Sequence, residues 1–157
     1  MSVDQNPEGG VIVVIETCNG LQQYLLDGRH RLVADEPDSV GGNDAGPDPY
    51  GLLLMALGAC TSITLRLYAR RKSWPLKKIR VHLRHARVHA EDCRDCDEKP
   101  VRLDCIDRVI QLDGALNAEQ LAQLLVIAEH CPVHRSLAAG FDVTTRLGPV
   151  SALDDGP

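Results

Sequence analysis

The chain has 157 residues, of which 44% are hydrophobic and 25% charged, and 17 Lys and Arg against 22 Asp and Glu give a formal net charge of -5. This length and balance predict a single globular domain. The acidic charge and the aromatic content of 3% argue against a nucleic-acid partner or an anionic membrane surface, because such partners favour basic patches and, for bases, stacking surfaces.

Six cysteines are the unusual feature of the composition. Residues 1–10 lack the basic and apolar regions of a signal peptide. The apolar run from Leu52 to Cys60 is far shorter than the roughly 20 residues that span a membrane. We therefore expect a cytoplasmic protein with reduced thiols, in which the cysteines are core residues, metal ligands or redox groups rather than a disulfide scaffold.

Three short strands are predicted in the first part of the chain, at residues 11–15, 22–26 and 30–34. Asn19-Gly20 and Asp27-Gly28 separate them, and both pairs accept the positive φ values of tight turns. Residues 35–48 are rich in Asp, Pro, Gly, Asn and Ser and predict a long irregular loop, which in a compact domain is usually functional or mobile.

A long helix is predicted to start at Asp48-Pro49, because Asp caps free N–H groups and Pro fits the first helical turn. It should run to about Lys72. Its first half has almost no polar face, so we expect that half to be buried on all sides.

The rest of the chain predicts two strands, two helices and a final strand. The strands lie at residues 79–88 and 105–112, on either side of a charged loop at 91–100. Asn117 and Gln120 form a capping-box pattern for a helix that reaches about His130, and Cys131-Pro132 begins a second helical segment through Leu137. After Gly140, residues 141–147 predict a strand. We expect one domain over residues 1–149 and a disordered acidic tail at 150–157.

Two cysteines lie in settings that suit thiol chemistry. Cys60 is in the middle of the long helix, where it is either a small core residue or, beside a cation such as Arg29, Arg31 or Arg135, a stabilised thiolate. Cys131 precedes Pro132 at a helix start, where free N–H groups favour a thiolate. An ordinary cap residue is the alternative there. Two such cysteines can act as a peroxidatic and a resolving thiol if they come within disulfide reach.

The segments from Gly46 to Thr61 and from His130 to Leu137 together carry a more specific signal. The motifs Gly46-Pro-Asp-Pro-Tyr-Gly-Leu-Leu-Leu, Leu-Gly-Ala-Cys60-Thr and His-Cys131-Pro-Val-His-Arg-Ser-Leu resemble the OsmC/Ohr family of thiol-dependent peroxidases. The resemblance covers the chain from about Gly28 to Leu147.

The resemblance implies an α+β fold in which two main helices pack with curved antiparallel sheets in an intertwined homodimer. It implies that Cys60 attacks an organic hydroperoxide, that Cys131 resolves the sulfenic acid, and that a dithiol reductant restores both thiols without a cofactor. Arg29 or Arg31 would activate Cys60. The apolar residues before Cys60 would bind the organic group, which assigns substrate binding to Tyr50, Leu53, Leu54 and Leu57.

Tyr50 stands where many family members have a glutamate that helps to hold the activating arginine, and a neutral phenol cannot replace a carboxylate in an ion pair. An alternative function is therefore a weakly catalytic or non-catalytic redox sensor, or a small-ligand-binding protein, on the same fold.

A second cluster consists of four residues with the spacing of metal or redox groups: His85, His89, Cys93 and Cys96. The two histidines share a strand face, and the Cys-x2-Cys spacing suits a zinc ion. A Cys93–Cys96 disulfide and plain exposed thiols are the other two readings. Cys18 and Cys105 are expected to be structural.

Overall fold

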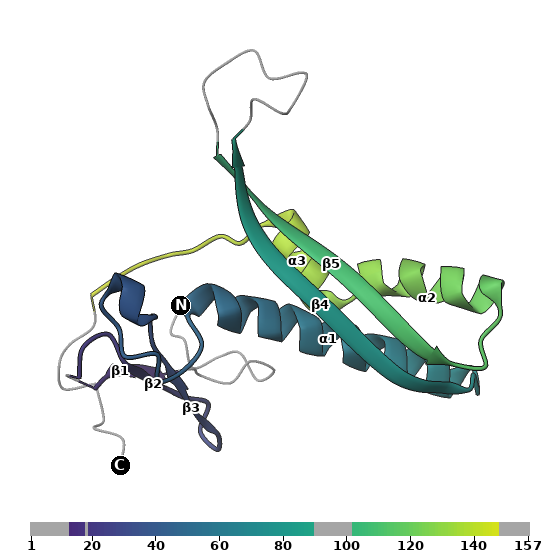
Figure 1. The fold of residues 1–157 in the computed structure, drawn as a ribbon, viewed down its shortest axis with the longest axis horizontal. Helices are drawn as coiled ribbons and strands as arrows, with labels where there is room; N and C mark the ends of the chain where they lie inside the picture. Colours follow the sequence, from purple (N-terminus) through teal and green to yellow (C-terminus); the bar gives the residue numbers. More distant parts are fainter. Residues whose placement is uncertain (1–12, 18, 90–101, 148–157) are drawn as a thin grey trace.

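A computed structural model of the chain describes residues 13–17, 19–89 and 102–147 (Figure 1). These residues form two antiparallel sheets, two longer α-helices and one short α-helix, so the predicted α+β class is confirmed. The elements are β1 (Val13–Glu16), β2 (Gln23–Leu26), β3 (Arg31–Ala34), the 3-10 helix η2 (Asp38–Val40), α1 (Pro49–Arg71), β4 (Leu76–His89), β5 (Arg102–Gly114), α2 (Ala118–Glu129) and α3 (Pro132–Ala139).

The first sheet is the predicted meander, with strand order β1-β2-β3 and antiparallel pairing throughout. Its turns use the glycines that the sequence offers, since Gly20 has φ +64° and Gly28 has φ +88°. Residues with side chains disfavour these angles, which explains why the chain reverses at these two points.

The loop from Asp35 to Asp48 is ordered around one carboxylate. Asp35 is 2% exposed and accepts hydrogen bonds from the backbone N–H groups of Glu36, Asn43 and Ala45 at 2.8, 3.0 and 3.2 Å. The predicted irregular loop is therefore held by the hydrogen bonds to Asp35, and it leads directly into α1.

Helix α1 begins and ends where the sequence predicts. Asp48 is its N-cap and accepts a hydrogen bond from the Gly51 N–H, and Pro49 occupies the first turn. The expectation that its first half is buried on all sides is wrong. A single stripe is buried, Leu57, Thr61, Leu65 and Ala69, whereas Met55 is 59% exposed. Among the described residues, the elements that pack on α1 bury this one stripe, and an apolar composition by itself does not say how many sides of a helix are covered.

By length and composition, α1 is long and apolar enough to cross a membrane, a property that core helices of soluble proteins share. The apolar run from Leu52 to Cys60, on which the sequence-based expectation rested, is shorter than the apolar part of the whole helix. The buried stripe of α1 nevertheless packs on β4, α2 and α3, which is the packing of a core helix.

The second sheet is one long hairpin of β4 and β5, which runs obliquely across α1 (Figure 1). Both strands are longer than predicted. Gly58 lies where α1 approaches β4 closely, because a Cβ atom there would be 3.0 Å from Leu83 Cδ1. The side chains that alternate towards the helices are those of Ile106, Arg108, Ile110 and Leu112.

A small core joins α1, α2 and this hairpin. Leu65, Leu124 and Ala128 are at most 1% exposed and form its centre. The capping box of α2 is confirmed, because Asn117 Oδ1 accepts from the Gln120 N–H while Gln120 Oε1 accepts from the Asn117 N–H. Cys131 is the N-cap of α3, and Gly140 ends that helix, both as predicted.

The predicted final strand is wrong for this chain taken alone. Residues 141–147 contain no strand, and Phe141, Val143 and Leu147 are 68%, 80% and 101% exposed. A strand needs a neighbouring strand for its backbone hydrogen bonds, and the described chain places none beside this segment. Cys18, Cys93, Cys96 and the tail at 150–157 lie outside the described residues.

Candidate active site

The fold brings Cys60 and Cys131 together from different helices. Cys60 lies midway along α1, and Cys131 caps α3, which packs on α1. The two thiols lie close enough for each to shift the pKa of the other. Both are free, but they differ in access, because Cys60 is half-buried and Cys131 is 0% exposed.

Several hydrogen-bond donors converge on the Cys131 sulfur. The His134 N–H lies 3.5 Å from Sγ and the Thr61 Oγ1 lies 3.8 Å from it, and the Cys60 thiol adds a third contact. Burial by itself raises the pKa of Cys131, but these hydrogen bonds outweigh burial and lower its pKa below the usual value for a thiol. Donors that point at a sulfur stabilise its anionic form.

The Cys60 thiol has the opposite tendency. Burial raises the pKa of Cys60, and its hydrogen bond with Cys131 raises that pKa further, although the Val133 N–H and the Thr64 side chain act against this. Of the two thiols, Cys131 therefore loses its proton more readily than Cys60.

A buried arginine lies behind this pair. The Arg108 side chain on β5 is 9% exposed. It donates from Nη1 to Thr61 Oγ1 at 3.0 Å and to the Ala128 carbonyl at 3.4 Å, and from Nη2 to Glu129 Oε1 at 2.8 Å. The other Glu129 oxygen lies 3.2 Å from His134 Nε2. Side chains from α1, β5, α2 and α3 thus meet in one network.

This network borders a pocket of about 440 Å³. Its polar lining comes from Asp104, Arg108, Glu129 and His134, and its apolar lining from Leu57, Ile106, Leu137 and Ala138. Such a mixture suits a small molecule with an apolar body and a polar end. Of the four predicted substrate-binding residues, only Leu57 lines this pocket.

The other three predicted substrate-binding residues lie elsewhere. Leu54 lines a separate, more apolar pocket of about 510 Å³ between α1 and β4, and Leu53 is half-buried on α1. The Tyr50 ring stacks on His85 with the ring centroids 4.3 Å apart. The apolar residues before Cys60 therefore lie on different faces of α1 and do not line one common pocket.

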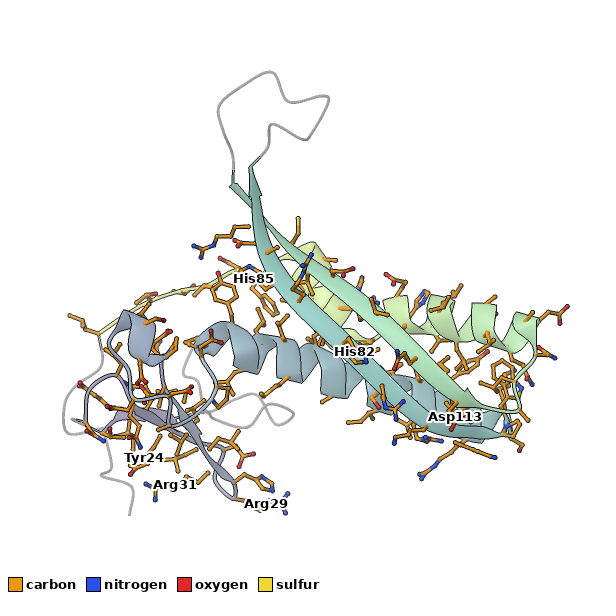
Figure 2. The ribbon with its side chains drawn as sticks, viewed as in Figure 1. Tyr24, Arg29, Arg31, His82, His85 and Asp113 are labelled. Carbon is orange, nitrogen blue, oxygen red and sulfur yellow. The ribbon has the colours of Figure 1, made fainter. Side chains whose placement is uncertain are left out.

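Arg29 and Arg31 lie at the β1–β3 sheet (Figure 2), and both are exposed. The Arg31 guanidinium lies 3.7 Å from the Tyr24 ring centroid, and the Arg29 N–H bonds to Asp27. Within the described part of the chain neither contacts Cys60, so their role as activating residues stays a prediction. Arg135 is exposed on α3, next to another surface pocket.

The candidate zinc cluster is only partly described. His85 lies on β4 (Figure 2). Its Nε2 lies 2.8 Å from Asp104 Oδ1, and the same ring stacks on Tyr50. Cys93 and Cys96 lie outside the described residues, and the part that is described holds no group of three or more potential metal ligands. Cys105, expected to be structural, is an exposed free thiol on β5.

Arg108 is the functional residue that sequence reasoning missed. A weak signal was available, because strand alternation places Arg108 on the same face as Ile106, Ile110 and Leu112. A charged residue in an apolar row is buried only with a partner. The partner, Glu129, comes from another element, so the sequence pattern alone does not identify the pair.

Comparisons with known proteins bear on the family and the fold of this chain. The sequence profile of the family described as OsmC-like protein matches residues 41–146. Among solved structures, an OsmC-like protein from Mycoplasma pneumoniae is similar with a TM-score of 0.65 at 16% identity, covering 85% of this chain and 89% of that one. No curated protein matches the chain.

Two further solved structures carry names that mention a function. An organic hydroperoxide resistance protein OsmC from Legionella pneumophila has a TM-score of 0.59 at 19% identity, covering 83% of this chain and 90% of that one. The organic hydroperoxide resistance protein OhrB of Bacillus subtilis has a TM-score of 0.55 at 15% identity, covering 81% and 88%. At such identities the similarity establishes the fold.

Proposed function

This chain belongs to the OsmC-like protein family, and from that premise we propose that it is a thiol-dependent peroxidase that reduces organic hydroperoxides. The observation that carries the proposal is the proximity of Cys60, which is half-buried, and Cys131, which is fully buried, since each thiol shifts the pKa of the other. Two free thiols at this range satisfy the first requirement of a peroxidatic and resolving pair.

The proposed reaction starts at the more accessible sulfur. The Cys60 thiolate attacks one oxygen of the hydroperoxide, the O–O bond breaks, and the alkoxide leaves and is protonated to an alcohol. Cys60 is then a sulfenic acid. The Cys131 thiolate attacks this sulfur, hydroxide leaves, and a Cys60–Cys131 disulfide forms. Two electrons pass from the thiol pair to the peroxide.

The pocket beside the network supports an organic rather than an inorganic peroxide. Leu57, Ile106 and Leu137 supply apolar surface for an alkyl or aryl group, and His134 supplies a polar contact for oxygen. The names of the L. pneumophila and B. subtilis structures point in the same direction for those proteins.

The disulfide must be reduced before a second turnover, so the proposal includes a dithiol reductant and no bound cofactor. We also propose the cytoplasm as the site of action. Cys60, Cys105 and Cys131 are all free in the described residues, and a cytoplasmic redox poise would keep them so.

A homodimer is the proposed assembly, as the family resemblance implies. Its support in this chain is a second apolar stripe on α1, made of Met55, Ala59, Ile63 and Leu67, opposite the buried one. Met55, Ile63 and Leu67 are 54–59% exposed. A second copy of the chain would cover this stripe.

Turnover of cumene hydroperoxide with dithiothreitol tests the function. We expect the wild type to consume the peroxide, Cys60→Ser to abolish consumption, and Cys105→Ser, which removes an exposed thiol on β5, to retain it. Unchanged turnover in Cys60→Ser would sink the proposal.

One observation favours a second candidate, a redox sensor or small-ligand-binding protein. Tyr50 occupies the position of the family glutamate, and its ring stacks on His85 and lies 5.8 Å from the Arg87 guanidinium carbon. A sensor would form the Cys60–Cys131 disulfide with one equivalent of peroxide but would show no sustained turnover with dithiol.

A further inference from the structure

A hydrogen-bond network lies beside Cys131. It consists of Thr61, Arg108 and Glu129, and none of these residues has a role in the proposed reaction. Arg108 is almost fully buried, and a guanidinium is always charged in proteins. Burial of such a charge is costly unless it is paired. Here one Arg108 nitrogen binds Glu129 and the other binds the Thr61 hydroxyl oxygen.

Thr61 links the arginine to the sulfur. Its Oγ1 accepts from Arg108 at 3.0 Å, and its single proton has two acceptors, the Leu57 carbonyl at 2.8 Å and the Cys131 sulfur at 3.8 Å. A charged acceptor attracts a donor more strongly than a neutral one. A Cys131 thiolate therefore competes for this proton better than a Cys131 thiol does.

We propose that Arg108, held by Glu129, is a positioning residue that keeps the negative charge of the cysteine pair on Cys131 through the Thr61 hydroxyl. This inference rests on the proposed function for its catalytic meaning. It differs from the predicted arrangement, in which Arg29 or Arg31 acts directly on Cys60.

If Arg108 keeps the charge on Cys131, then Cys131 also acts as the base that takes the proton of the Cys60 thiol, in addition to resolving the sulfenic acid. A sulfur that is 0% exposed is poorly placed to meet a hydroperoxide, whereas the half-buried Cys60 has access. The Cys131 thiolate takes the proton of the Cys60 thiol, the Cys60 thiolate attacks the peroxide, and the new Cys131 thiol returns that proton to the leaving alkoxide. Cys131 is then a thiolate again, ready to displace hydroxide from the Cys60 sulfenic acid.

The charges around Cys131 come from every element that packs on it. Cys60 is on α1, Arg108 on β5, Glu129 on α2 and His134 on α3. Asp104 lines the adjacent pocket. Glu129 also lies near His134. Because several charged or titratable groups surround Cys131, the effect of Arg108 is measured as the difference in the Cys131 titration midpoint between variants.

A site-resolved titration tests the inference without any peroxide. The full chain, reduced and labelled with 13C at the cysteine Cβ atoms, gives one NMR signal for each cysteine, and Cys→Ser variants assign them. We expect Cys131 to titrate below Cys60 in the wild type. In Arg108→Gln the Cys131 midpoint should rise by about one pH unit, a tenfold smaller thiolate fraction at a given pH.

Three further variants make the result specific. Thr61→Val should raise the Cys131 midpoint, and Thr61→Ser, which restores the hydroxyl, should return it to the wild-type value. Arg84→Gln removes an exposed arginine from the neighbouring strand β4 and should leave it unchanged. If Arg108→Gln does not fold, the comparison of Thr61→Val with Thr61→Ser decides the matter.

An unchanged Cys131 midpoint in Arg108→Gln and in Thr61→Val, or a wild-type pair in which Cys60 titrates first, would overturn the inference. Peroxide turnover is measured separately. If the protein turns over peroxide but the Cys131 midpoint does not shift as expected, the proposed function stands and the proposed role of Arg108 is wrong. If the midpoint shifts as expected but no peroxide is consumed, the effect of Arg108 on Cys131 stands and the proposed function is wrong.

Discussion

Asp35 shows what one carboxylate does for the loop before α1. Three backbone N–H groups from different points of this loop donate to it, so the loop closes around a single side chain. Burial raises the pKa of Asp35, but the three hydrogen bonds outweigh burial and leave the pKa below its usual value. The charged form is therefore the stabilising one.

We predict that Asp35→Asn lowers the melting temperature at pH 7, because an amide presents only one oxygen to these donors. The stabilisation by Asp35 is present above the unfolded-state pKa of about 4 and is lost as the pH falls through the lower folded-state value. The difference from the wild type should therefore shrink towards pH 3. Asp38→Asn, at an exposed position of the same loop, is the control for thermal unfolding followed by circular dichroism. An equal difference at pH 7 and pH 3 would contradict the account.

At the scale of single residues, local patterns predicted what depends on neighbours in sequence. Cys131 before Pro132 predicted an N-cap, and Asp48 before Pro49 predicted another, and both are confirmed. Arg108 was not predicted, because its partners Thr61 and Glu129 come from two other elements. Only the folded chain brings those three together.

Among the elements, α2 has the clearest local start signal, the reciprocal Asn117 and Gln120 hydrogen bonds. We predict that Asn117→Ala destabilises the protein by about 1 kcal/mol, since the first-turn N–H groups lose a side-chain acceptor. Asn117→Asp should stay close to the wild type in urea unfolding. Equal losses in the two variants would mean that this cap contributes little.

The contact between α1 and α2 depends on Leu65, which is 0% exposed and packs with Leu124 and Ala128. We predict that Leu65→Ala lowers the free energy of unfolding by about 2–5 kcal/mol, because it leaves a cavity in a small core. Leu125→Ala, at a residue 55% exposed on α2, should cost far less in the same urea titration. A loss below about 1 kcal/mol for Leu65→Ala would place the core elsewhere.

The boundaries of the helices were predictable because caps are local features, whereas β4 and β5 are longer than their alternation predicts. The surroundings of α1 were not predictable, since the same apolar sequence fits a helix covered on one side or on all sides. The stripe at Leu57, Thr61, Leu65 and Ala69 is buried, and the opposite stripe is not. That difference depends on which elements reach α1.

At the scale of the whole molecule, the uncovered stripe of α1 predicts association. Ile63 is 59% exposed at its centre. We predict that Ile63→Asp weakens the proposed homodimer about thirtyfold, a loss of about 2 kcal/mol, because a charge would be buried between copies. Val109→Asp, at a residue 51% exposed on β5, is the matched control, and light scattering gives the masses. A monomeric wild type, or an Ile63→Asp protein that associates equally well, would contradict the prediction.

Residues 141–147, like the uncovered stripe of α1, lack a partner in the described chain. They have the alternation of a strand, with Phe141, Val143 and Leu147 on one face, but they have no partner strand in the described chain. Sequence patterns predict what a segment is able to form, and the partner decides whether it forms.

The most direct test of the central claim treats the reduced protein with one equivalent of cumene hydroperoxide and quantifies both products. We expect one equivalent of the alcohol and a peptide pair linked through Cys60 and Cys131, with repeated cycles once a dithiol is added. Alcohol formed without this linkage, or a disulfide that joins either cysteine to a different partner, would contradict it.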